Sequence, residues 1–130
     1  MSLVYLDTSV ALAHLLGEDV SPLDGLWEES LVSSRLLAYE LWTRLDAMGL
    51  RESHAPEARE LLERVTTLEL VGPILGRVLE GLAVKVRTLD ALHLACLLFL
   101  KDQGQSIQLA SYDHRLSAAA KTLGVPLYPV

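Results

Sequence analysis

Four acidic residues occupy the positions at which this sequence most readily suggests chemistry: Asp7, Glu40, Asp90 and Asp113. Asp7 and Asp113 follow short apolar runs, whereas Glu40 and Asp90 lie in apolar stretches with helical spacing. A carboxylate in apolar surroundings is costly unless it faces a partner or a cation. We therefore ask whether the four carboxylates share a site.

If these carboxylates converge, their mutual repulsion must be neutralised. Two like charges 4 Å apart cost roughly 4 kcal/mol at an effective dielectric constant of about 20. No lysine is adjacent to any of the four in the sequence, although Arg44, Arg87 and Arg115 are near. A divalent cation is the simpler solution, and ligands that are all oxygen favour Mg²⁺ or Mn²⁺ over zinc. The sequence therefore predicts a site for Mg²⁺ or Mn²⁺.

Two of the acidic residues also have simpler interpretations. A carboxylate in the first turn of a helix, such as Asp90, is favoured by the helix dipole by roughly 0.3–1 kcal/mol. Glu40 precedes Arg44 by four residues, and an ion pair with that spacing is worth about 0.3–0.5 kcal/mol. Both alternatives remain open at the level of the sequence.

Short apolar runs alternate along the chain with segments whose apolar residues recur at helical spacing. The runs predict strands at 3–6, 31–33, 66–71, 107–110 and 125–128. The intervening segments predict helices at 9–16, 35–48, 56–65, 74–82, 88–100 and 115–123. We expect Ser9 and Thr88 to cap the N-termini of their helices and Pro56 to occupy a first helical position.

This alternation favours an α/β fold, in which a mainly parallel sheet is covered by helices on both faces. No linker or repeat interrupts the chain, so residues 1–130 are predicted to form a single domain. In open sheets of this class, sites form beyond the carboxyl ends of the strands. Asp7 and Asp113 both follow predicted strands, so we expect them at the same edge of the sheet.

Composition excludes several classes of protein. The chain has 130 residues, 51% of them hydrophobic, which is ample for a core, and its net charge of −6 argues against binding nucleic acid by overall charge alone. The single cysteine, Cys96, lies in an apolar helical stretch and fits a reducing compartment. No apolar run approaches the ~20 residues that span a bilayer, and residues 1–7 do not resemble a signal peptide. We therefore expect a cytoplasmic protein with no membrane association.

The four acidic residues lie in four segments, which follow one another along the chain: YLDTS at 5–9, the helical stretch that carries Glu40, LDALHLA at 89–95 and SYDHRL at 111–116. With these segments in this order, the chain resembles the PIN-domain ribonucleases, and more narrowly the VapC-type toxins of toxin–antitoxin pairs. The resemblance extends over residues 3–130. It implies a three-layer α/β/α domain of the PIN type.

The resemblance implies that the chain is a metal-dependent endoribonuclease. It assigns Asp7, Glu40, Asp90 and Asp113 as catalytic metal ligands, and Ser111 as the hydroxyl that is often threonine in the family. Arg44, Arg87 and Arg115 are the basic residues nearest to these motifs, and we expect them to contact RNA phosphates. His93 is expected to form a hydrogen bond near the site rather than to bind the metal.

The resemblance also implies partners and leaves two alternatives. Toxins of this kind are neutralised by a cognate antitoxin, and many form homodimers, for which the weakly charged segment 73–86 offers an interface. One alternative is a Mg²⁺-dependent phosphoryl-transfer or phosphatase-like enzyme with Asp7 as nucleophile, which the lack of a strand-terminal lysine argues against. The other is a non-catalytic interaction module.

Overall fold

A four-stranded parallel sheet forms the centre of the computed structural model, which describes residues 2–17 and 24–130. Its strands are β1 (Ser2–Leu6), β2 (Ser30–Ser34), β3 (Thr66–Leu68) and β4 (Ser106–Ala110). They are arranged in the order β3-β2-β1-β4, with Val4 opposite Leu31 and Leu6 opposite Ala110. The predicted α/β class with a mainly parallel sheet is confirmed.

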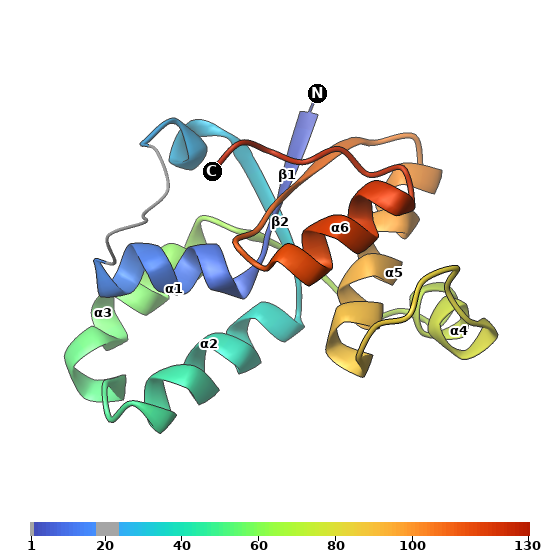
Figure 1. The fold of residues 1–130 in the computed structure, drawn as a ribbon. Helices are drawn as coiled ribbons and strands as arrows, with labels where there is room; N and C mark the ends of the chain where they lie inside the picture. Colours follow the sequence, from blue (N-terminus) through green and yellow to red (C-terminus); the bar gives the residue numbers. More distant parts are fainter. Residues whose placement is uncertain (1, 18–23) are drawn as a thin grey trace.

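Helices cover both faces of this sheet (Figure 1). One layer contains α1 (Thr8–Leu16), α2 (Leu36–Ala47) and α3 (Arg51–Glu63), which contact one another. The other contains α4 (Gly72–Glu80), α5 (Thr88–Asp102) and α6 (His114–Thr122), with α5 between its two neighbours. A short 3-10 helix, η1 (Asp24–Glu28), precedes β2. In the part of the chain that the structure describes, no helix is long and apolar enough to cross a membrane.

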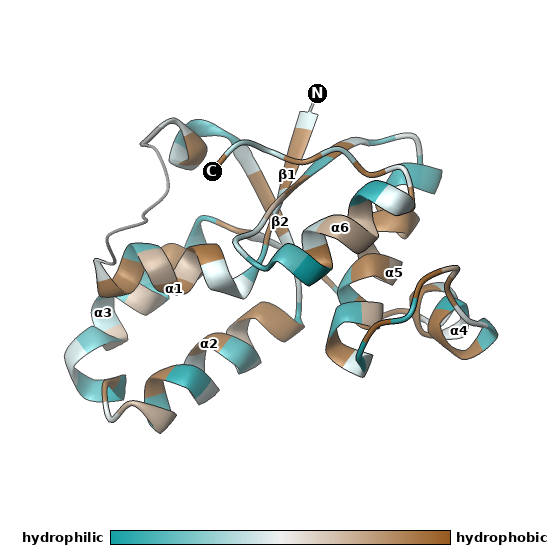
Figure 2. Ribbon diagram, viewed as in Figure 1, coloured by the Kyte–Doolittle hydropathy of each residue, from teal (hydrophilic) through white to brown (hydrophobic). Residues whose placement is uncertain are grey.

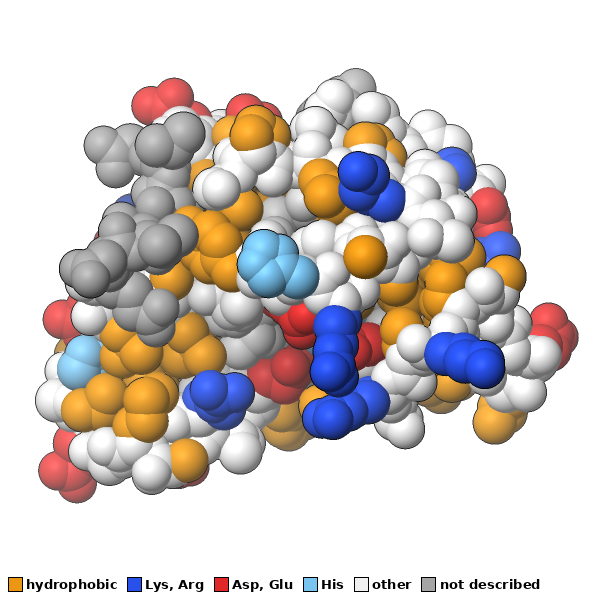
Figure 3. Space-filling model, viewed as in Figure 1, with side chains coloured by type: hydrophobic (Ala, Val, Ile, Leu, Met, Phe, Trp, Pro, Cys, Tyr) orange, Lys and Arg blue, Asp and Glu red, His pale blue; other side chains and the backbone are white. Residues whose placement is uncertain are grey.

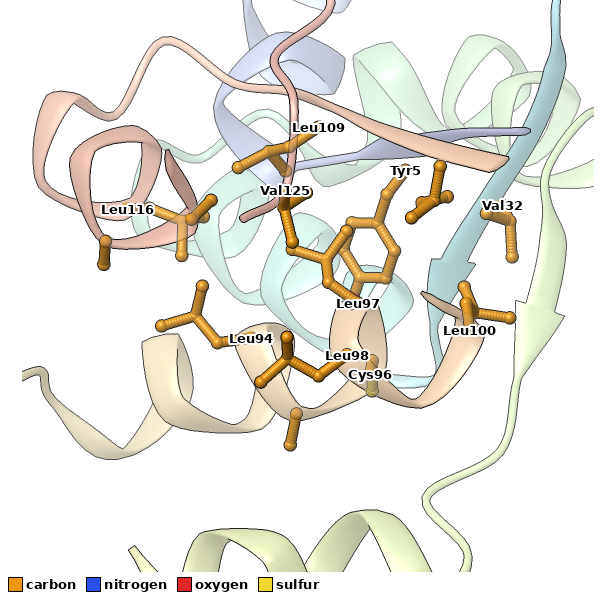
Figure 4. Close-up of a cluster of buried hydrophobic side chains, with 14 of the residues drawn as sticks. Tyr5, Val32, Leu94, Cys96, Leu97, Leu98, Leu100, Leu109, Leu116 and Val125 are labelled. Atoms are coloured by element: carbon orange, nitrogen blue, oxygen red, sulfur yellow. The ribbon is translucent and has the colours of Figure 1, made fainter. Parts of the chain in front are cut away.

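Each face of the sheet has its own hydrophobic core, because successive side chains of a strand point to opposite faces. In β1, Val4 and Leu6 pack with α1, α2 and α3, whereas Tyr5 packs with α5 and α6. Hydrophobic residues are accordingly prominent on β1 and β2 (Figure 2). Figure 4 shows the core that contains Tyr5, in which Cys96 lies among leucines. Burial raises the pKa of the Cys96 thiol to about 11.

Two predicted helix caps and one predicted helix start were wrong. Asp7, rather than Ser9, caps α1, and Thr88 is the first residue of α5, where no side chain caps the helix. The third helix begins at Arg51, so Pro56 lies inside it. Proline lacks an N–H and forfeits one helical hydrogen bond, and the packing of Ala58 and Leu61 into the core compensates for that loss.

Two predicted strands also differ. β3 ends at Leu68 rather than at residue 71, because the chain turns at Glu69 and starts α4 at Gly72. The predicted strand 125–128 is reduced to one bridge between Leu109 and Leu127. Pro126 faces β4, where its C=O accepts the Leu109 N–H, but it has no N–H with which to extend the ladder.

Candidate active site

The four acidic residues line one cavity of about 940 Å³ at the carboxyl end of the sheet. Asp7 follows β1, Asp113 lies beyond β4, and Glu40 and Asp90 come from α2 and α5. Figure 3 shows acidic side chains gathered in a hollow on this face, with Lys and Arg side chains beside them. The expected convergence of the four residues on one cavity is therefore observed.

Helix N-termini bring these carboxylates together. Asp7 caps α1 and Asp113 caps α6, where its Oδ1 accepts the backbone N–H groups of Arg115 (2.9 Å) and Leu116 (3.2 Å). Asp90 lies in the first turn of α5, and Glu40 lies in the second turn of α2. Because the N-terminal end of a helix carries partial positive charge, α1, α5 and α6 offset part of the repulsion among the acids.

Two serines fix the carboxylate of Asp7, which is only 6% exposed. The hydroxyls of Ser9 and Ser111 donate to its Oδ2 at 2.6 and 2.8 Å. These hydroxyls also accept backbone N–H groups, from Tyr112 and Asp113 respectively. The predicted site residue Ser111 therefore connects Asp7 with the loop that carries Asp113.

Glu40 does not pair with Arg44, so that simpler alternative was wrong. Its Oε1 lies 2.6 Å from Nε2 of His93, whose Nδ1 is 2.7 Å from the Tyr5 hydroxyl. Burial disfavours the charged imidazole, but its hydrogen bond to Glu40 and the charges of nearby carboxylates outweigh burial and raise the pKa of His93. The expectation that His93 forms a hydrogen bond near the site is confirmed.

Asp90 shows the repulsion most directly. Burial raises the pKa of its carboxyl, and the charges of Asp113, Asp7 and Glu40 raise it further. Within residues 2–17 and 24–130, no hydrogen bond or ion pair reaches the Asp90 side chain. The simpler alternative explained Asp90 by the dipole of α5 alone. That explanation is incomplete, because the charges of three other carboxylates also act on Asp90.

The types of ligand in the cavity fit a hard divalent cation. It contains four carboxylates and the hydroxyls of Ser9 and Ser111, whereas Cys96 is buried in the core. Oxygen ligands of this kind suit Mg²⁺ and Mn²⁺. Among the described residues, however, no three His, Cys, Asp or Glu side chains are arranged to hold one ion together. The fit is thus one of donor chemistry, not of a preformed coordination shell.

A second cavity, of about 690 Å³, adjoins the first and shares Asp90 and Asp113 with it. Arg87 and Arg115 line this second cavity, whereas Arg44 lines the acidic one. Sequence reasoning missed Lys85, which also lines the second cavity. The alternating pattern VKVR at 84–87 was the available signal, because it places Lys85 and Arg87 on the same side of an extended segment.

Tyr5 was the other residue missed, because in the sequence it belongs only to an apolar strand. Its hydroxyl is buried against His93, 88 positions away along the chain. The sequence contains no local signal for that contact.

Comparison with known proteins finds one match, to a family model. No curated protein matches the chain. The family model of the PIN domain matches residues 4–122, which is most of the chain. The fold agrees with that match, and the chain belongs to the PIN-domain family, a family of nucleases.

Proposed function

We propose that this chain is an endoribonuclease that depends on Mg²⁺ or Mn²⁺. PIN domains typically use divalent metals. The observation that carries the proposal is the convergence of four carboxylates on one cavity. Among the residues that the structure describes, no Lys or Arg side chain forms an ion pair with any of these four.

In this proposal Asp7, Glu40, Asp90 and Asp113 hold the metal. When bound, the ion supplies an activated water and positive charge opposite the leaving oxygen of the phosphodiester. Ser9 and Ser111 occupy Oδ2 of Asp7, so Oδ1 is the oxygen available to a ligand. Ser111 is thus a positioning residue, and the carboxylates bind the ion rather than attack the substrate.

The distribution of basic side chains supports a polyanionic substrate. Four arginines are committed to carboxylates elsewhere: Arg35 to Glu69, Arg51 to Asp46, Arg64 to Glu60 and Arg77 to Asp102. The basic residues that line the two adjoining cavities are Arg44, Lys85, Arg87 and Arg115. None of them has an ion-pair partner within the described ranges. We propose that they contact RNA phosphates on either side of the metal.

We further propose that the chain forms a single domain over residues 1–130 and is the toxin of a type II toxin–antitoxin pair, as the VapC-like motifs imply. A cognate antitoxin would place a basic side chain in the acidic cavity.

We propose that a second copy of the chain packs on α4, within the predicted segment 73–86. Leu75 and Leu79 are 41% and 88% exposed there and lie one turn apart.

The alternative of a phosphoryl-transfer enzyme with Asp7 as nucleophile gains no support. Oδ2 of Asp7 accepts two hydroxyl hydrogen bonds. No lysine is among the described residues that line its cavity. The non-catalytic alternative is the one that an activity assay must address.

The test is cleavage of a short single-stranded RNA and of the matching DNA, with Mg²⁺, Mn²⁺ or chelator. Wild-type protein should cleave RNA only with metal, and Asp7→Asn should not cleave it. The matched control is Glu63→Gln, which removes an exposed carboxylate of α3 outside both cavities. Wild-type protein that cleaves neither substrate with either ion would refute the proposed activity.

The toxin role has its own test, which is expression of the chain alone in a bacterial host. Growth should slow with wild-type protein and continue with Asp7→Asn. Co-expression of the gene product encoded next to it should restore growth. Normal growth with wild-type protein that is folded and active on RNA would contradict the toxin role but leave the nuclease proposal intact.

A further inference from the structure

Three side chains form a continuous line from the core to the acidic cavity: Tyr5, His93 and Glu40. The first two are almost fully buried, with exposed fractions of 0% and 2%. The side chain of Glu40 is 23% exposed and lines the cavity. The line therefore connects a core tyrosine to a carboxylate of the proposed metal site.

Both ring nitrogens of His93 have partners. An ionised Glu40 carboxylate only accepts hydrogen bonds, so Nε2 of His93 must carry the proton and donate it. Nδ1 lies 2.7 Å from the Tyr5 hydroxyl, and the two rings meet edge to face at 82°. The imidazole is thus held at both nitrogens and packed in place, which fixes its orientation.

We propose that His93 is a positioning residue for Glu40, held in turn by Tyr5. It fixes Oε1 of Glu40 and leaves Oε2 as the oxygen that can bind the metal. This inference rests on the proposed metal-dependent activity. It assigns His93 and Tyr5 a part in that activity without contact with metal or substrate.

A merely structural role explains the arrangement less well. An apolar side chain would fill the core at position 93 without a buried polar group to satisfy. One polar partner of His93 is a carboxylate of the acidic cavity and the other is the Tyr5 hydroxyl, and neither is a backbone group of the core. Side chains that orient metal ligands are commonly worth about 10- to 100-fold in metal affinity or activity.

The experiment measures Mn²⁺ binding directly, by titration without RNA, beside KM for RNA and the melting temperature. His93→Leu should weaken Mn²⁺ binding by roughly 10- to 100-fold and leave KM for RNA unchanged. His93→Gln should recover most of that loss, because its amide nitrogen can replace Nε2 as donor to Glu40. Tyr5→Phe should show a smaller loss than His93→Leu.

The matched control is His54→Gln, at a histidine of α3 outside the cavity that contacts Ser53, and it should bind Mn²⁺ as wild type does. If folded His93→Leu also binds Mn²⁺ as tightly as wild type, the positioning role is overturned while the metal site stands. If His93→Leu does not fold, Tyr5→Phe decides, and Mn²⁺ binding by that folded variant as tight as in wild type overturns the positioning role. Absence of Mn²⁺ binding and cleavage in wild type would instead refute the proposed function.

Discussion

Charges are arranged in opposite ways on the exposed helices and in the acidic cavity. On α2 and α3, Asp46 forms a salt bridge with Arg51, whose hydrogen bonds lower the pKa of that carboxyl. In the cavity, Asp90 has no such partner, and burial together with three other carboxylates raises its pKa. The first arrangement favours the folded state, and the second opposes it. Sites maintained against their own electrostatics are typical of function rather than stability.

The largest expected difference between the two regions is in catalysis. Asp90→Asn should lower RNA cleavage roughly 100-fold or more, the scale of losing one group that stabilises transition-state charge. Asp46→Asn should leave cleavage unchanged, because its carboxylate lies outside both cavities and binds Arg51. Initial rates at saturating Mn²⁺ measure both. Equal rates for the two variants would mean that the cavity is not the active site.

Metal should stabilise the folded protein when the cavity carboxylates are intact, whether or not the exposed Asp46 carboxylate is present. A ligand that binds only the folded state adds about 2.7 kcal/mol at a hundredfold excess over its Kd. Mn²⁺ should therefore raise the melting temperature of wild type and of Asp46→Asn by the same amount, and raise that of Asp90→Asn much less. Thermal denaturation with and without chelator makes this comparison. A melting temperature in wild type that neither Mn²⁺ nor Mg²⁺ changes would count against a metal site.

Without metal, the order of stability should reverse. Asp90→Asn removes a charge repelled by Asp7, Glu40 and Asp113, so the metal-free variant should melt a few degrees above wild type. Asp46→Asn removes an exposed ion pair and should melt at or slightly below wild type. Melting curves in chelator provide the measurement. A metal-free Asp90→Asn that melts below wild type would show that Asp90 has a stabilising partner instead.

The smallest effect concerns pH at an exposed pair, Arg35 with Glu69. The Arg35 guanidinium lowers the pKa of the Glu69 carboxyl. A lowered pKa means stability that is present above the ordinary value and lost as pH falls through the folded value. Glu69→Gln should therefore melt slightly below wild type at pH 7, with the gap closing in acid as the pH falls through the lowered pKa of Glu69. A gap that widens in acid would reverse this assignment.

Much of the fold was predictable because the signals for it are local. Apolar runs gave four strands and helical periodicity gave six helices, but the boundaries failed where two local signals competed. Asp7, Thr8 and Ser9 can all cap a helix, and the backbone selects Asp7. Pro56 favours a first helical position, and burial of the helix overrides that preference.

The convergence of the four acidic residues on one cavity was predictable, but the side-chain contacts around them were not. Strand ends placed Asp7 and Asp113 at one edge, because the sheet is parallel. The hydrogen bond between His93 and Glu40 joins residues 53 positions apart on two different helices. Only the relative orientation of α2 and α5 determines that contact, and no sequence period encodes it.

The Leu109–Leu127 bridge has a consequence for how copies of this chain can associate. Unpaired sheet edges invite other strands to add to them. On the β4 edge the segment that follows α6 already pairs with the backbone of Leu109, and the two prolines of that segment, Pro126 and Pro129, supply no N–H donors. On the opposite edge, β3 is only three residues long. Among the described strands, one edge of the sheet is therefore very short and the other is already partly paired, which disfavours association by adding strands to this sheet.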